Sequence, residues 1–284
     1  MELHTITGRT PLVRITQKVY AKLETYSPTG SVKDRLVTYL VSKAIKRGEI
    51  NDATVMCEAT SGNTGISLSA IAANLGLKCK IFMPSDMSEE RRTMMRTFGA
   101  TIVDAPPSDF SMAIEMRDEY VAKNKNVWTP NQFSNEENIE CHQEITAPEI
   151  LDDIRTHNLG DWSAFVHGAG TGGTIEGVRR FVHSKGMSTK TCMVIPKESP
   201  HGIQGIGDGK DFLAKQEDMD STVIVKTQHA IARAKKFCKE TGLLVGISAG
   251  ANLVAAEQYE KDNPDANLIV TMLCDRGERY LTIF

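Results

Sequence analysis

Residues 164–178 have the sequence AFVHGAGTGGTIEGV, and this stretch indicates the class of fold. The apolar run at 164–167 is typical of a buried strand, and the apolar spacing at 175–183 predicts a helix. The loop between them, residues 168–174, is rich in glycine. The N–H groups at the start of a helix bind anions, and glycines let a ligand approach the backbone closely. The stretch therefore predicts a phosphate-binding loop between a parallel strand and a helix.

The same alternation of short strands and helices runs along the rest of the chain. Further strands are predicted at 54–57, 79–83, 101–103, 192–195 and 268–273. Further helices are predicted at 33–46, 64–75, 88–98, 228–241 and 251–260. Strands that alternate with helices indicate a parallel sheet covered on both faces, and 284 residues are enough for two such sheets. Residues 198–220 predict a long loop, which in a compact domain usually serves function.

The composition excludes several classes of partner. Lys and Arg number 33 against 36 Asp and Glu, a net charge of -3, so no strong field attracts nucleic acid or an anionic membrane. The longest uncharged run, 59–77, is too polar to span a bilayer. Residues 1–4 carry no signal-peptide pattern, so a cytoplasmic location is expected. The six cysteines and seven histidines show no metal-ligand spacing, so buried reduced thiols and no metal site are expected.

Two more loops resemble the first in chemistry. Residues 58–65, EATSGNTG, follow a predicted strand and open a helix, and their hydroxyls, glycines and N–H groups form an anion cradle. Nothing basic is present, so the cradle suits a carboxylate held by hydrogen bonds. Residues 246–252, GISAGAN, place Ser248 before a helix. Ser248 makes one hydrogen bond in a dry site or is a simple helix N-cap, and the two interpretations are equally good.

Residues 30–35, GSVKDR, contain a candidate nucleophile. Ser31 and Asp34 have capping-box spacing, which predicts Ser31 as the N-cap of the helix 33–46. Lys33 then lies in the first turn, where the helix dipole disfavours its charged form, as suits a lysine that forms a Schiff base. A solvated surface lysine is the simpler interpretation of this motif taken alone.

One alternative comes from another match in the glycine-rich loop. Gly168, Gly170 and Gly173 fit G-x-G-x-x-G, the pattern of Rossmann proteins that bind NAD, with Glu198 as the acid for the ribose. This alternative leaves Lys33 and the loop 58–65 unexplained.

Together and in this order, the motifs resemble the cysteine synthase family of fold-type-II pyridoxal-phosphate enzymes. The resemblance covers nearly the whole chain and is carried also by residues 7–12, 22–24, 83–84, 88–92, 98–100, 132–133, 148–150, 203–207 and 277–281. It implies two doubly wound α/β domains, similar to the tryptophan synthase β subunit, with the active site in the cleft between them. We place the smaller N-terminal domain at 35–140 and the larger phosphate-binding domain at 1–34 plus 141–284.

The resemblance implies a role for each matching residue. Lys33 would form the internal aldimine with pyridoxal 5'-phosphate, Asn63 would bond the ring hydroxyl and Ser248 would face the pyridine nitrogen. The phosphate would be bound by Gly170, Thr171, Gly172, Gly173 and Thr174. The amino-acid substrate would be bound by Thr60, Ser61, Gly62, Thr64 and Gln132, with Gly205 in the loop 204–207 that lines the entrance.

The reaction implied is a transfer at Cβ. Sulfide or thiosulfate would replace the acetoxy group of O-acetyl-L-serine through an aminoacrylate intermediate, giving L-cysteine or S-sulfocysteine, and a homodimer is implied. Residues 83–92 and 274–281 resemble the B type of cysteine synthase, whereas residues 202–207 resemble the A type. Ala147 replaces the family's usual glycine and 197–220 is shortened, so the donor stays open. Cystathionine β-synthase, serine or threonine dehydratase and a non-catalytic homologue are the alternatives within the fold.

Overall fold

The computed structural model describes residues 6–207 and 212–284. They form two compact units, each described by itself below. The small unit is Ser27–Asn131 with Ile6, Thr7 and Arg279–Ile283, and the large unit is Gly8–Tyr26 and Gln132–Glu278 with Phe284. The bounds differ from the predicted domain 35–140, because the first helix buries Leu36 and Leu40 in the small unit's core and so brings Lys33 with it. The expectation about residues 1–4 lies outside the described residues.

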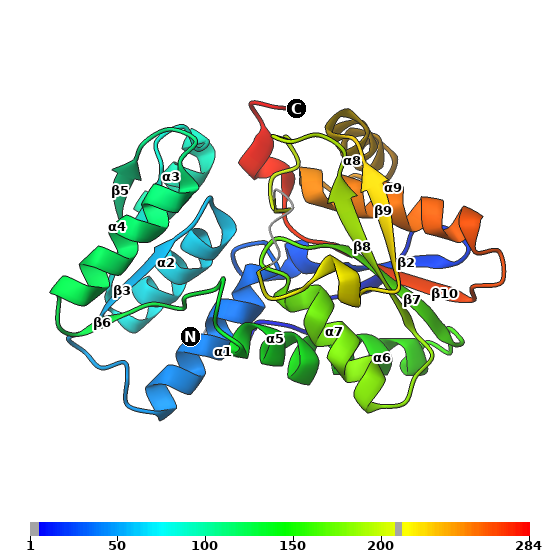
Figure 1. Cartoon of the computed structure of the whole chain (residues 1–284), viewed down its shortest axis with the longest axis horizontal. Helices are drawn as coiled ribbons and strands as arrows, with labels where there is room; N and C mark the ends of the chain where they lie inside the picture. The colour runs from blue at the N-terminus through cyan, green and yellow to red at the C-terminus, as the bar shows by residue number, and fades with distance from the viewer. Residues whose placement is uncertain (1–5, 208–211) are drawn as a thin grey trace. The chain divides into compact units, whose positions relative to one another are not determined.

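The small unit is a four-stranded parallel sheet with helices on both faces (Figure 1). Its strands, in the order β5-β4-β3-β6, are β3 (Val55–Ala59), β4 (Lys78–Pro84), β5 (Thr101–Ala105) and β6 (Val127–Trp128). Its helices are α1 (Lys33–Lys46), α2 (Asn63–Leu75), α3 (Glu89–Thr97) and α4 (Phe110–Lys123). Side chains alternate across a strand, so Ile81 and Met83 of β4 join the core beneath α1 and α2, whereas Phe82 joins the core beneath α4.

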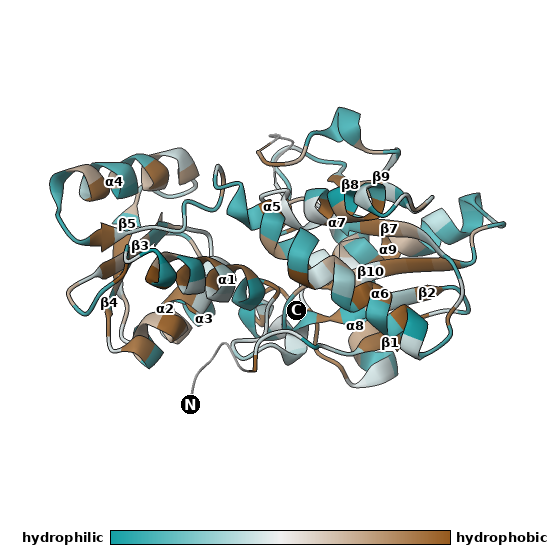
Figure 2. Cartoon of the chain, turned by 90° about the horizontal axis from the view of Figure 1, so that it is seen from below, coloured by the Kyte–Doolittle hydropathy of each residue, from teal (hydrophilic) through white to brown (hydrophobic). Residues whose placement is uncertain are grey.

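The large unit is a six-stranded sheet in the order β1-β2-β10-β7-β8-β9, parallel except for β1. The strands are β1 (Leu12–Arg14), β2 (Val19–Leu23), β7 (Trp162–Gly168), β8 (Lys190–Pro196), β9 (Ser221–Val225) and β10 (Leu268–Leu273). The helices are α5 (Glu137–Cys141), α6 (Ala147–Thr156), α7 (Gly173–Ser184), α8 (Thr227–Thr241) and α9 (Ile247–Asp262). Figure 2 shows β7 and β10 in the hydrophobic colour, in keeping with strands buried on both faces.

In each sheet the strand order reverses at one strand. In the small unit the chain runs from β3 outward to β4 and β5, then returns to place β6 on the other side of β3. In the large unit it runs from β7 outward to β8 and β9, then returns to place β10 on the other side of β7. Ligands of open α/β sheets bind beyond the carboxyl end of the strand where the order reverses. The loops there are residues 60–62 and 169–172, which belong to the two anion loops predicted from sequence.

The predicted α/β class, with parallel sheets covered on both faces, is confirmed. The prediction misses strands β1, β2, β6 and β9 and helices α4, α5 and α6. In β2 a charged residue hides the buried pattern. Lys22 of β2 is fully buried and pairs with Glu149 at 2.7 Å and Asp153 at 2.5 Å. The six cysteines form no disulfide, and five of them are buried. Within the described ranges, no helix is long and apolar enough to span a bilayer.

A buried ion pair stabilises the small unit at the end of β3. Glu58 and Arg117 of α4 lie 2.6 Å apart, with side chains 0% and 3% exposed. Arg117 also donates to Thr129 Oγ1 at 3.2 Å and to Asn131 Oδ1 at 3.3 Å. The pair therefore fixes α4 and the segment after β6 against the strand that leads into residues 60–62.

We expect Arg117→Met to lower the free energy of unfolding by about 3 kcal/mol, because it removes the counter-charge of a buried carboxylate. The control is Arg96→Met, since Arg96 pairs with Glu89 at the surface with side chains 51% and 69% exposed. That change is expected to cost less than about 1 kcal/mol. Urea denaturation measures the free energy of unfolding of both variants. Equal losses would contradict the stabilising role of the Glu58–Arg117 pair.

Candidate active site

The predicted phosphate loop leads directly from β7 into α7. Gly172 is the N-cap residue, with a left-handed φ of 89° that favours glycine, and it has no side chain with which to cap the helix. Within the loop, Thr171 Oγ1 accepts a long, weak hydrogen bond from Gly173 N at 3.4 Å. Because a helix N-terminus carries partial positive charge and N–H donors, the start of α7 fits an anion such as a phosphate.

Close packing explains the glycines of this loop. A Cβ on Gly170 would lie 2.6 Å from the carbonyl oxygen of Gly205. A Cβ on Gly173 would collide with Oδ1 of Asn138. The loop is thus enclosed by two other segments, residues 205–207 and helix α5, and Gly207 N donates to Ala169 O at 2.8 Å.

Two polar side chains that the sequence analysis missed support the loop from behind. Asn138 Nδ2 donates to Thr171 Oγ1 at 3.0 Å and to the carbonyl of Gln132 at 2.8 Å. His142 Nε2 lies 3.2 Å from Thr174 Oγ1, and its Nδ1 lies 2.9 Å from Thr146 Oγ1. Residues His142–Thr146 form a π-helical turn between α5 and α6, a feature frequent at functional sites. The only sequence signal was their place just after Gln132.

Ser248 lies in the first turn of α9 and is 4% exposed. Its interpretation as a helix N-cap is wrong, because α9 begins at Ile247 and Gly246 is the N-cap residue. Gly205 is a neighbour: its φ is +99°, and a Cβ there would lie 3.3 Å from Ser248 Oγ. The large unit therefore brings together the phosphate loop, Gly205 and Ser248, with Gln132 linked to the loop through Asn138.

The second predicted loop, in the small unit, leads from β3 into α2. Gly62, which has no side chain, is the N-cap residue, and Asn63 begins the helix. Thr60 Oγ1 accepts from Gly62 N at 3.1 Å, which shapes the turn. Thr64 lies in the first turn of the helix and is buried, whereas Ser61 is exposed.

The loop itself contains no basic residue, but a basic side chain from another helix contacts it. Arg91 of α3 is 3% exposed and donates from Nη1 to the carbonyl of Ser61 at 3.3 Å. A Cβ on Gly62 would lie 2.6 Å from Arg91 Cδ, so the side chain runs directly against the turn. Arg91 also packs on the Tyr280 ring, 4.9 Å from its centroid. The sequence hides this contact because Arg91 lies 30 residues from Ser61.

Lys33 begins α1, as predicted, and is half-buried. The predicted capping box is wrong, because the N-cap residue is Val32 and Asp34 bonds elsewhere. Asp34 accepts from Thr29 N at 2.8 Å, Thr29 Oγ1 at 2.6 Å and Ser67 Oγ at 2.5 Å. Burial raises the pKa of Asp34, and these hydrogen bonds and the Arg279 charge oppose that rise. Asp34 thereby ties the start of α1, where Lys33 lies, to α2.

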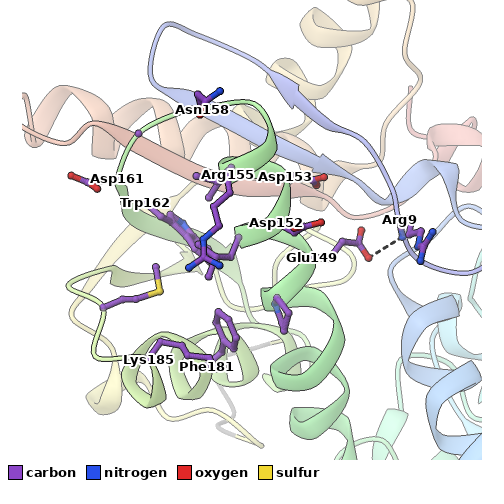
Figure 3. A pocket seen from close by; sticks show the side chains of 15 residues that line it. Arg9, Glu149, Asp152, Asp153, Arg155, Asn158, Asp161, Trp162, Phe181 and Lys185 are labelled. Carbon is purple, nitrogen blue, oxygen red and sulfur yellow. Dashed lines mark hydrogen bonds between the residues drawn. The ribbon is translucent and has the colours of Figure 1, made fainter.

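The large cavity in Figure 3 is not formed by the predicted site residues. Its volume is about 1550 Å³, and α6 and the segment before β7 supply most of its lining. None of the predicted site residues lines it. Glu149 on its wall accepts from the backbone N of Arg9 and Thr10 at 2.8 and 3.0 Å and pairs with Lys22, so it serves to hold the N-terminal segment.

The residues present fit pyridoxal phosphate. A phosphate requires backbone donors and room close to them, and the glycine-lined start of α7 offers both. The cofactor's aldehyde requires a lysine amine, and Lys33 is half-buried beside a tightly bonded Asp34.

A family model described as "Pyridoxal-phosphate dependent enzyme" matches residues 3–275. The chain belongs to this family of pyridoxal-phosphate dependent enzymes. Cysteine synthase B of Campylobacter jejuni is 39% identical over 97% of this chain and 95% of the relative. A solved hydrogen sulfide-producing enzyme of Fusobacterium nucleatum, a variant in complex with an α-aminoacrylate intermediate, matches with a TM-score of 0.91 and 36% identity over 99% of this chain and 90% of the other.

Another solved relative, O-acetylserine dependent cystathionine β-synthase of Helicobacter pylori, matches with a TM-score of 0.91 and 31% identity over 99% of this chain and 97% of the other. Family membership overturns the NAD alternative, and the structure agrees. Glu198 is engaged at the start of α8, where it accepts from Thr227 N at 3.0 Å and Thr227 Oγ1 at 3.1 Å. The bond from Thr227 N lowers the pKa of Glu198.

We expect Gly173→Ala to weaken binding of pyridoxal phosphate by about tenfold or more, because the added methyl displaces Asn138 and the start of α7. Absorbance titration of cofactor-free protein measures this affinity. The control is Gly186→Asn just beyond α7, where a side chain meets nothing within 4 Å and asparagine tolerates the φ of +63°. Equal affinity of the Gly173 variant and the wild type would contradict the assignment.

Proposed function

We propose that this chain is a cysteine synthase that replaces the acetoxy group of O-acetyl-L-serine with a sulfur nucleophile. The observation that carries the proposal is the full-length match to cysteine synthase B, 39% identical, in a chain that retains Lys33 and both anion loops. The donor is sulfide or thiosulfate, and the product L-cysteine or S-sulfocysteine.

The roles of the residues are divided between binding and proton transfer. Pyridoxal phosphate, when bound, supplies an electron sink for the charge left at Cα. The start of α7 holds the phosphate, with Thr171 and Thr174 as hydroxyl donors and Asn138 and His142 keeping them in place. Ser248, buried and neutral, meets the ring nitrogen without forcing its protonation.

Lys33 is the general base in this proposal. Its Nζ removes the Cα proton of the substrate, acetate leaves Cβ with the bonding electron pair, and sulfur forms the new bond at Cβ. Lys33 then returns the proton to Cα. The N–H groups at the start of α2 and the hydroxyls of Thr60 and Thr64 bind the substrate carboxylate, and the Arg91 charge beside the turn favours an anion there.

In this proposal Gln132 helps to bind the amino-acid substrate and Gly205 belongs to the loop that lines the entrance. The hydrogen bond between Asn138 and Gln132 and the closeness of Gly205 to Gly170 support these roles. The working enzyme is a homodimer located in the cytoplasm, as the family resemblance implies.

The test is an assay with O-acetyl-L-serine and, separately, sulfide, thiosulfate or homocysteine. We expect cysteine or S-sulfocysteine with the first two, and a fall of about a thousandfold or more for Lys33→Ala, because the general base is lost. Lys43→Ala at the far end of α1 is the control and keeps wild-type activity. Turnover with homocysteine alone would instead identify a cystathionine β-synthase. Full activity of Lys33→Ala would contradict the proposal.

A further inference from the structure

Arg279 joins two parts of the small unit through a buried guanidinium. Arg279 as a whole is 1% exposed. Nε donates to Asn63 Oδ1 at 2.6 Å, and Nη2 donates to the carbonyl of Thr29 at 2.6 Å. Both bonds are short and charge-assisted, the strong kind of hydrogen bond.

The chemistry of the guanidinium settles the orientation of the Asn63 amide. An amide offers an oxygen that accepts and a nitrogen that donates, and the two ends are easily confused in structures. Arginine has only donors and keeps its charge in proteins. Only the oxygen of Asn63 can therefore face Arg279. The amide nitrogen, Nδ2, then points away from Arg279 and is presented as a donor.

We propose that Arg279 is a positioning residue that fixes Asn63 as a hydrogen-bond donor toward the bound cofactor. The inference rests on the proposed function, in which Asn63 meets the ring oxygen of pyridoxal phosphate. Since Asn63 has only N–H groups to offer there, the ring oxygen must accept from it, and this favours the ionised form of that oxygen, which is the stronger acceptor. Arg279 thus acts on the ring oxygen through Asn63, without touching the oxygen itself.

The network around Arg279 keeps this arrangement rigid. Thr29, whose carbonyl accepts from Arg279, donates from N and Oγ1 to Asp34, and Ser67 of α2 donates to the same carboxylate. Asp34 supplies a counter-charge to the buried guanidinium. Because Asp34 follows Lys33 and Ser67 lies one turn beyond Asn63, the network connects the two residues that would bind the cofactor in this unit.

The test compares two substitutions of Asn63 in the holoenzyme. Asn63→Asp keeps an oxygen for Arg279 but turns a second oxygen toward the cofactor, whereas Asn63→Ala removes both groups. We expect Asn63→Asp to bind pyridoxal phosphate about tenfold more weakly than Asn63→Ala, with a shifted absorption maximum, because two acceptors face each other. Affinity is measured by absorbance titration and equilibrium dialysis. If Asn63→Asp binds as tightly as the wild type, the inference is overturned.

A double-mutant cycle tests the role of Arg279 itself. Arg279→Met is expected to weaken cofactor binding about tenfold in the wild type but hardly at all in Asn63→Ala, because Arg279 acts through Asn63. Arg279→Lys, which is also donor-only, is expected to retain the wild-type absorption maximum. Equal losses in both backgrounds overturn the inference.

The outcomes separate two kinds of failure. If Arg279→Met does not fold, the comparison of Asn63→Asp with Asn63→Ala tests the inference, since neither of those variants alters Arg279. If the wild type takes up no pyridoxal phosphate, the proposed function fails. If the wild type is active and the Asn63 pair or the cycle gives the contrary result, only the inference about Arg279 fails.

Discussion

The structure depends on one constraint: parallel strands deliver their loops to one edge of a sheet, where the first N–H groups of each helix have no partner within the helix. Each unit uses this at the strand where the order reverses, β3 in the small unit and β7 in the large one. Both helices that follow, α2 and α7, have glycine as the N-cap residue. A chain with a net charge of -3 can therefore bind anionic groups through its backbone, and needs no basic surface to do so.

Backbone donors alone do not hold a loop in place, and each unit adds buried polar side chains behind it. In the large unit Asn138 and His142 fix the hydroxyls of Thr171 and Thr174. In the small unit Arg279 fixes Asn63, and Glu58 with Arg117 secures the end of β3. These groups come from remote parts of the chain. Binding at each loop therefore depends on correct folding of the unit that contains that loop.

The rhythm of strands and helices and both anion loops could be predicted because they depend on local spacing. The supporting residues could not, because their partners are distant. Arg91 pairs with a carbonyl 30 residues away, and Arg279 with an amide 216 residues away. The capping box at Ser31 failed for a related reason: Asp34 has better donors in Thr29 and in Ser67, 33 residues on. Strand β2 was hidden because its Lys22 is buried by carboxylates of α6.

The central claim is that Lys33, at the start of α1, is the lysine that binds pyridoxal phosphate. The most direct measurement is to reduce the purified holoenzyme with sodium borohydride, which makes the lysine–cofactor bond permanent, and to map the digested peptides by mass spectrometry. The account predicts that the added pyridoxyl-phosphate mass lies on Lys33 and on no other lysine. The mass on a different lysine, or on none in protein that is yellow before reduction, would contradict it.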